Sequence, residues 1–351
     1  MKARLIGLIS FFIMVAPTTQ AHVRWFIEGK VIPDASFTLD GINTLTVFGA
    51  FALITVCGAL QYLVNGSHTR NYPAKINTLI TLLHKPIHPP FKLDWFILVL
   101  FLNLMLIVNL LLGDFLAPNL KLLPQVVMLG IIIQMIAILA SIISISLTGV
   151  ALIIVALWLP MVFPSAMALD YFFEVIGVGI AYVFIAPSIN QNDNNFYGYL
   201  GISEEVDTKK LRQWGVTILR IALGLQLMTL ALHNKLLEPG AALIFIQEFP
   251  FYNFMQQLGF EEYSHLHFVF AGGVFEFTFG LILMLGLAPR LMSLLLACIF
   301  ATTTILSGIH EVPGHLPIFA VLLILFCAGD PRKSQYSKQD TREQPLSGAL
   351  G

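Results

Sequence analysis

Long apolar stretches separated by short polar ones run along most of the chain. Apolar runs of about 20 residues are long enough to cross a bilayer as helices. The connection 236–264 is rich in aromatic residues. It is the longest connection on the side predicted below to face outward, and it is predicted to lie along the membrane surface as an interfacial or re-entrant segment. The predicted fold class is an all-α bundle of nine transmembrane helices, at residues 45–64, 94–112, 124–143, 145–163, 167–186, 215–235, 267–287, 292–309 and 316–328.

The apolar run at 124–163 is too long for one helix, even a tilted one. We split it at the polar stretch 141–149. With an outer start and nine spans, 15 of the 19 Lys and Arg residues lie on the inner side, as the positive-inside rule requires. Treating the run as one span leaves only 7 of the 19 inside. We therefore expect the mature N-terminus outside and the C-terminus in the cytoplasm.

The N-terminus has the layout of a secretory signal peptide. Lys2 and Arg4 precede an apolar stretch, and small residues lead to Ala21. We expect residues 1–21 to be removed, so that the mature chain begins at His22; an uncleaved anchor is the alternative. The expected location is a bacterial inner (cytoplasmic) membrane, with residues 22–44 as an outer segment and 331–351 as a flexible cytoplasmic tail.

The composition agrees with a membrane protein. Apolar residues make up 57% of the chain and charged residues 11%, too few for a soluble surface. The net charge of −1 gives no basic surface for nucleic acid. The three cysteines lie in apolar segments without a CxxC motif, which predicts neither a disulfide framework nor a thiolate metal site. The lipid bilayer is the partner that composition indicates.

Several spaced residues in the C-terminal third carry a family resemblance. They are Arg220, Gly224 and Lys235 along one predicted helix, then Glu276, Gly280, Gly286 and Arg290 along the next. With these residues, the segment 215–330 resembles the DoxX-like family of four-helix membrane proteins. That family includes subunits linked to thiosulfate:quinone oxidation and to maturation of periplasmic redox enzymes. The resemblance implies a four-helix domain with a redox-linked role, preceded by a five-span region at 45–210 with cytoplasmic loops at 65–93 and 187–214.

Six of the nine histidines fall on the predicted outer side, at the ends of spans. Neutral imidazole is the commonest metal ligand, and a layer of imidazoles suits copper, zinc or haem iron. After cleavage, the first residue would add its free amine to its ring nitrogen as a chelating pair. We expect a metal site here; the alternative is that each histidine is a polar anchor or helix-end partner. The candidate ligands are His22, His233, His265, His267, His310 and His315.

Residues 310–315 hold two histidines and Glu311, which superficially resembles a zinc-protease motif. That chemistry needs histidines at i and i+4 on one helical face. Here the spacing is i+5, and a Pro-Gly pair interrupts the helix. We interpret the segment as a turn between two spans, with Glu311 at the outer aqueous edge, rather than as a protease site.

Carboxylates inside predicted spans are the second chemical signal. Glu276 lies about 14 Å into its span at 1.5 Å per residue, near the midplane, where an ionisable group is a functional candidate. It is predicted to be a proton relay or a contact for a quinone head group; the alternative is a protonated acid bonded across a helix contact. Asp170 and Glu174 share one helical face at the outer end of a span. They are interpreted as a cation site, as part of the histidine layer, or as a solvated helix start. Arg220 lies nearer the inner side and is not a direct partner for Glu276.

These signals lead to two functional hypotheses. The first is a redox-linked membrane protein with an outward-facing copper or haem site, acting as an oxidoreductase or a subunit of one. Its helix bundle would serve a quinone or a small apolar substrate, with a periplasmic redox partner. The second is a non-catalytic transporter, or a membrane anchor or maturation subunit for a periplasmic partner. The chain has no Walker A, dinucleotide or GxSxG motif, and no CxxCH for covalent haem.

Overall fold

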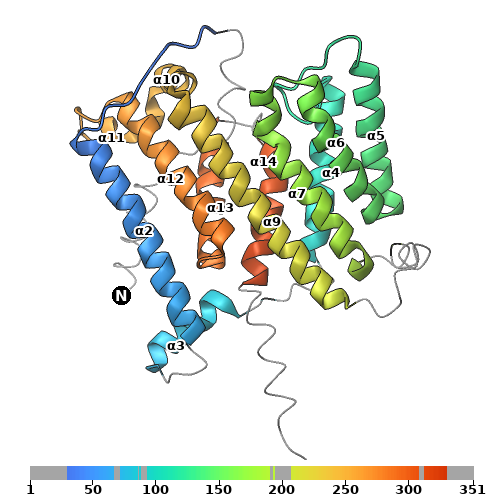
Figure 1. Cartoon of the computed structure of the whole chain (residues 1–351), viewed down its shortest axis with the longest axis horizontal. Helices are drawn as coiled ribbons and strands as arrows, with labels where there is room; N and C mark the ends of the chain where they lie inside the picture. Colours follow the sequence, from blue (N-terminus) through green and yellow to red (C-terminus); the bar gives the residue numbers. More distant parts are fainter. Residues whose placement is uncertain are drawn as a thin grey trace, which may run out of the picture.

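The computed structural model describes residues 30–66, 72–85, 87, 93–189, 193, 207–307 and 312–329. Within these ranges all regular elements are helices, packed into one bundle (Figure 1). Seven helices in the described part are long and apolar enough to cross a membrane. They are α2 (Gly41–Gly66), α4 (Leu93–Leu112), α6 (Ile145–Val162), α7 (Ser165–Ile189), α9 (Thr208–Ala231), α12 (His265–Leu285) and α13 (Pro289–Ser307). This architecture is compatible with a multi-pass membrane protein.

Two shorter apolar helices, α5 (Val127–Ile143) and α14 (Val312–Ala328), run alongside the long ones (Figure 1). Each has 17 residues and is about 26 Å long, slightly less than a hydrocarbon core of about 30 Å. Each of the nine predicted spans overlaps one of these helices. Seven candidate spans are therefore established by length and composition, and the count of nine remains a prediction.

The apolar run at 124–163 forms two helices that meet at Ser144. The backbone of Ser144 is extended, and its side chain accepts a hydrogen bond from the Leu147 N–H. The Asp193 carboxylate accepts from the N–H groups of Ile145 and Ser146 at 3.1 and 3.0 Å, and from the Ser144 hydroxyl. Because the first N–H groups of a helix have no partners within it, these bonds cap α6. The polar stretch within the apolar run thus marks a helix boundary.

Glycines allow two pairs of helices to approach closely. A Cβ atom added to Gly149 of α6 would lie 2.6 Å from the Gly179 carbonyl oxygen of α7. A Cβ added to Gly224 of α9 would lie 2.6 Å from the Gly280 carbonyl oxygen of α12, and the reverse distance is also 2.6 Å. Small residues are how membrane helices bring their backbones together. These crossings position α7, α9 and α12, which carry the buried polar groups described below.

The aromatic connection forms a folded cap at one end of the bundle. It contains α10 (Pro239–Glu248), a 3-10 turn η4 (Pro250–Tyr252) and α11 (Phe254–Gln257). Phe245 and Tyr252 pack with Phe268 of α12 in a small apolar core. The segment 30–40 passes over α10, where Pro33 lies so close that Gly240 has no room for a Cβ. The position of this aromatic cap along a membrane surface stays a prediction.

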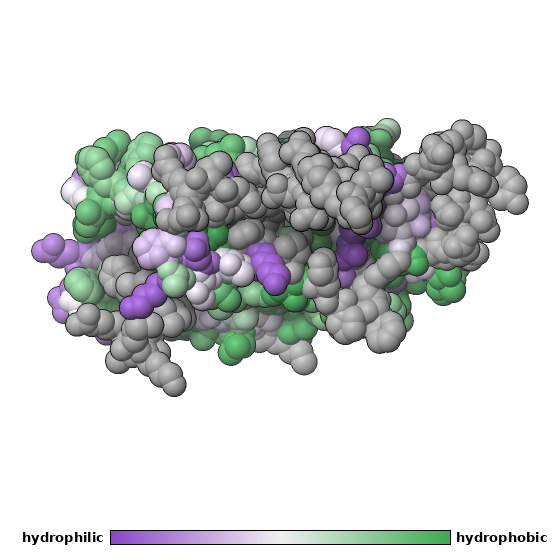
Figure 2. All heavy atoms as spheres, turned by 90° about the horizontal axis from the view of Figure 1, so that it is seen from below, coloured by the Kyte–Doolittle hydropathy of each residue, from purple (hydrophilic) through white to green (hydrophobic). Residues whose placement is uncertain are grey.

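The opposite end of the bundle carries α3 (Ala74–His84) and the start of α9 (Figure 1). Lys75, Lys85, Lys209 and Lys210 are exposed there. Figure 2 views this end, where hydrophilic residues gather between apolar flanks. Basic residues predicted to lie inside thus share one end, and the aromatic cap lies at the other.

Candidate functional site

Buried polar side chains meet where α7, α9 and α12 pack against η3, a π-helical turn (Leu232–Leu237) that continues α9. Each of these side chains belongs to a residue that is at most 4% exposed. Polar and ionisable groups inside a membrane bundle are costly and are functional candidates by default, and π-helical turns are frequent at functional sites. The residues are Asp170, Gln226, Asn234, Lys235 and Glu276.

Lys235 and Glu276 form a buried ion pair. The Lys235 ammonium donates to one carboxylate oxygen of Glu276, which is completely buried. Gly273 lets α12 approach η3 closely, since a Cβ there would lie 2.7 Å from Leu236 Cδ2 and 3.1 Å from the Lys235 Cβ. The other Glu276 oxygen has no hydrogen-bond partner in the described part of the chain. Arg220 donates instead to the carbonyls of Leu283 and Met284 at 3.0 and 2.8 Å, as expected for a residue that is not the Glu276 partner.

Asp170 is buried, not part of a solvated helix start. Because α7 begins at Ser165, Asp170 lies in its second turn, facing α9. The Asn234 amide donates to an Asp170 carboxylate oxygen at 3.0 Å. Gln226 donates to the Asp170 carbonyl at 2.8 Å and accepts from the Glu174 N–H at 3.1 Å. Asp170 and Glu174 therefore share the face of α7 that α9 covers, as their spacing predicts.

Glu174 lies between two partly enclosed cavities. Both cavities are small, and Val178 also lines each of them. In the described ranges, no hydrogen bond or ion pair reaches the Glu174 carboxyl group. The other residues of the larger cavity come from α4, α6, α7, α14 and the 116–117 turn: Leu102, Met105, Leu116, Ala117, Leu152, Tyr171, Val175, Gly314 and Pro317. An unpaired carboxyl group thus faces apolar walls.

Each described histidine of the predicted set has a partner of its own. His265 contacts the Asn253 amide at 3.2 Å, and buried His315 contacts the Thr304 hydroxyl at 3.1 Å. His233 contacts the Asn234 side chain at 3.2 Å. No group of three or more His, Cys, Asp or Glu residues that could hold a metal occurs in the ranges that the structure covers. Two predicted metal ligands, His22 and His310, lie outside the described residues, as do Glu311 and the predicted signal peptide.

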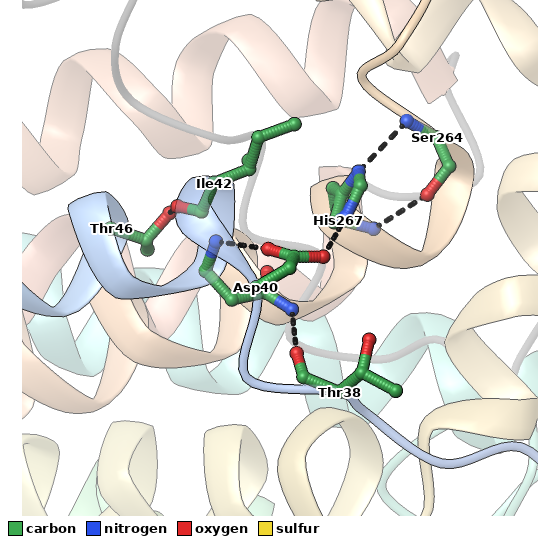
Figure 3. Close-up of polar contacts among 7 residues, drawn as sticks. Thr38, Asp40, Ile42, Thr46, Ser264 and His267 are labelled. Carbon is green, nitrogen blue, oxygen red and sulfur yellow. Dashed lines mark hydrogen bonds and ion pairs between the residues drawn. The ribbon is translucent and has the colours of Figure 1, made fainter.

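His267 pairs with Asp40 at the end of the bundle that carries the aromatic cap (Figure 3). The imidazole Nε2 lies 2.6 Å from the Asp40 carboxylate, and Nδ1 accepts from the Ser264 N–H at 3.2 Å. The Asn43 N–H donates to Asp40 at 2.8 Å. This bond and the His267 contact lower the pKa of the Asp40 carboxyl group. The pair ties the start of α2 to the start of α12.

Ser264, His267 and Asp40 are the residue types of a hydrolase triad, but their geometry is different. The Ser264 hydroxyl accepts from the backbone N–H of His267, and the ring Nδ1 is occupied by the Ser264 N–H (Figure 3). No ring nitrogen is therefore placed to take a proton from the serine. The arrangement is a helix capping box with histidine at its third position.

No protein-family model, no curated protein and no solved structure matches this chain.

Proposed function

We propose that this chain is an integral membrane protein that binds a small lipid-soluble molecule of the quinone class beside Glu174. The observation that carries the proposal is the Glu174 carboxyl group, which has no partner in the described ranges and faces two apolar cavities. Binding sites for small molecules are mostly apolar, with few polar groups that orient the ligand. A quinone fits this pattern, because it combines an apolar ring and tail with carbonyl oxygens that accept hydrogen bonds.

The protonation state of the Glu174 carboxyl group supports a ligand that accepts a hydrogen bond from it. Burying a carboxylate without a cation costs far more than burying the neutral acid. The neutral acid carries one O–H donor. Glu276 has Lys235 as its partner and does not line either cavity, so the predicted head-group contact moves from Glu276 to Glu174.

A redox role extends the proposal. A bound quinone accepts or donates electrons, which agrees with the redox-linked role that the DoxX-like resemblance implies. The outward-facing copper or haem site also stays a proposal, and it now depends on His22 and His310. The quinone site depends on neither of them.

Titration of the purified protein with decylubiquinone, followed by calorimetry, tests the binding site. Replacing the acid in Glu174→Leu removes one hydrogen bond with a net value of about 0.5–1.5 kcal/mol, so binding is expected to weaken about 2- to 13-fold. Val178→Phe fills both cavities and is expected to abolish binding. Glu261→Gln, at an exposed carboxylate of the aromatic cap, is the matched control and should bind as wild type. Absence of binding to wild type, or wild-type affinity in both cavity variants, would contradict the proposal.

A further inference from the structure

Polar side chains lie between Glu174 and the aromatic-cap end of the bundle, whereas apolar side chains lie between Glu174 and the α3 end. We propose that Glu174 exchanges its proton with water at the aromatic-cap end, through Asp170 and His233. The inference deepens the proposed function, since a carboxyl group that donates to a ligand needs a source for its proton. The exchange itself requires no ligand, so the two proposals can fail separately.

The route begins at a water-accessible pair. The Glu238 side chain is 52% exposed, and its Oε1 lies 3.9 Å from Nε2 of His233, whose side chain is 23% exposed. Imidazole is the side chain that most readily gains and loses a proton near neutral pH. His233 thus places an imidazole where solvent reaches the surface of the bundle.

Asn234 connects this surface group to the buried acid. Its side-chain oxygen lies 3.2 Å from Nδ1 of His233, and its amide nitrogen donates to Asp170 at 3.0 Å. An amide does not titrate, so Asn234 positions the imidazole and the carboxyl group. The proton passes between them through water, which buried polar groups commonly bind.

The last step runs along α7. Asp170 and Glu174 are one turn apart on the same face, where side chains at i and i+4 are about 5–6 Å apart at Cβ. Gln226 bonds to the backbone of both residues and fixes this turn against α9. Glu174 gives its proton to the Asp170 carboxylate, and Asp170 passes it on to the His233 imidazole and to water.

The other titratable groups that the structure describes on the neighbouring elements already have partners. Lys235 of η3 bonds to Glu276 of α12, and His315 of α14 contacts a threonine hydroxyl. The Tyr171 hydroxyl donates to the Asn119 side chain at 2.6 Å. Toward the α3 end, the smaller cavity has only apolar walls: Val178, Leu219, Ala222, Leu223, Ile318 and Val321. Among the described residues, the geometry therefore opens the route toward the aromatic cap and not toward α3.

Infrared spectroscopy of the purified protein, transferred from H₂O to D₂O, measures the exchange directly. The C=O stretching band of a protonated carboxyl group shifts on deuteration. The band belongs to Glu174 if it is absent in Glu174→Gln and displaced in Glu174→Asp. We expect the exchange to slow about tenfold or more in Asp170→Asn and in His233→Leu, because it then waits on local opening of the bundle. Asp94→Asn and His84→Gln, at the α3 end, are the matched controls and should exchange as wild type.

Three results would overturn the route: exchange in Asp170→Asn and His233→Leu as fast as in wild type, equal slowing in the control variants, or no protonated carboxyl band assignable to Glu174. The quinone proposal is judged separately. Wild-type decylubiquinone affinity in His233→Leu together with slow exchange supports both proposals. Slow exchange in a protein that binds no decylubiquinone supports the route and refutes the ligand.

Discussion

Removing one member of the Lys235–Glu276 pair should destabilise the bundle more than removing both. Neither residue is more than 4% exposed, so Lys235→Met or Glu276→Leu alone leaves an unpaired charge or an unpaired acid inside. Breaking a buried pair in this way costs about 3–5 kcal/mol. Replacing both members with apolar residues of similar volume is often neutral or stabilising, by up to about 4 kcal/mol. With each single replacement costing at least about 3 kcal/mol and the double replacement neutral or stabilising, the expected coupling free energy is about 6 kcal/mol or more.

A double-mutant cycle on the free energy of unfolding, measured by SDS titration in mixed micelles, determines this coupling. Lys30 and Glu248 supply the matched control, because they form an ion pair with side chains that are 40% and 41% exposed. Exposed pairs contribute about 0–1 kcal/mol. A Lys235–Glu276 coupling no larger than that of Lys30 and Glu248 would refute the reasoning that links burial to the strength of the pair.

Three further predictions concern stability. Gly280→Val should lower the free energy of unfolding by about 1–3 kcal/mol or more through overpacking against α9. Gly58→Ala, where an added Cβ meets no atom within 4 Å, should have little effect. Equal free energies of unfolding for the two variants, measured by SDS titration, would exclude the close crossing of α9 and α12. Asp193→Ala removes the cap of α6 and should lower the free energy of unfolding by about 0.5–2 kcal/mol. SDS titration measures this change, and an unchanged free energy would show that the cap contributes nothing. Folding lowers the pKa of Asp40 below its ordinary value of 3.8. The ionised Asp40 therefore stabilises the folded state at pH values above 3.8, and this stabilisation is lost as the pH falls through the pKa of the folded state. Thermal unfolding followed from pH 6 down to pH 3 should therefore show a steeper acid loss in wild type than in Asp40→Asn, and parallel curves would contradict this.

Much of the helical architecture could be predicted, because apolar runs and helix breaks are local signals. The boundary at Ser144 is an example, since serines at helix starts and the length of the run both indicate it. The His267 capping role also had a local signal in the Ser264-x-x-His267 spacing. The set of outer histidines, taken together, instead predicts metal binding for His267.

The contacts between helices could not be predicted in the same way. Lys235 and Glu276 are 41 residues apart, and depth counting places one near a span end and the other near the midplane. The long lysine side chain and the π-helical turn bring them together, and neither effect follows from periodicity. Glu174 illustrates the same limit, because its position between two cavities depends on which faces of α4, α9 and α14 meet.

Labelling with a photoreactive azido-quinone tests the central claim most directly, since it reports where a quinone binds in the intact protein. The account predicts labelled peptides from α7 and α14 around Glu174 and Pro317, with labelling removed by excess decylubiquinone and lost in Val178→Phe. Labelling that resists competition, persists in Val178→Phe, or falls only on the lipid-facing side of α5 would contradict a quinone site beside Glu174.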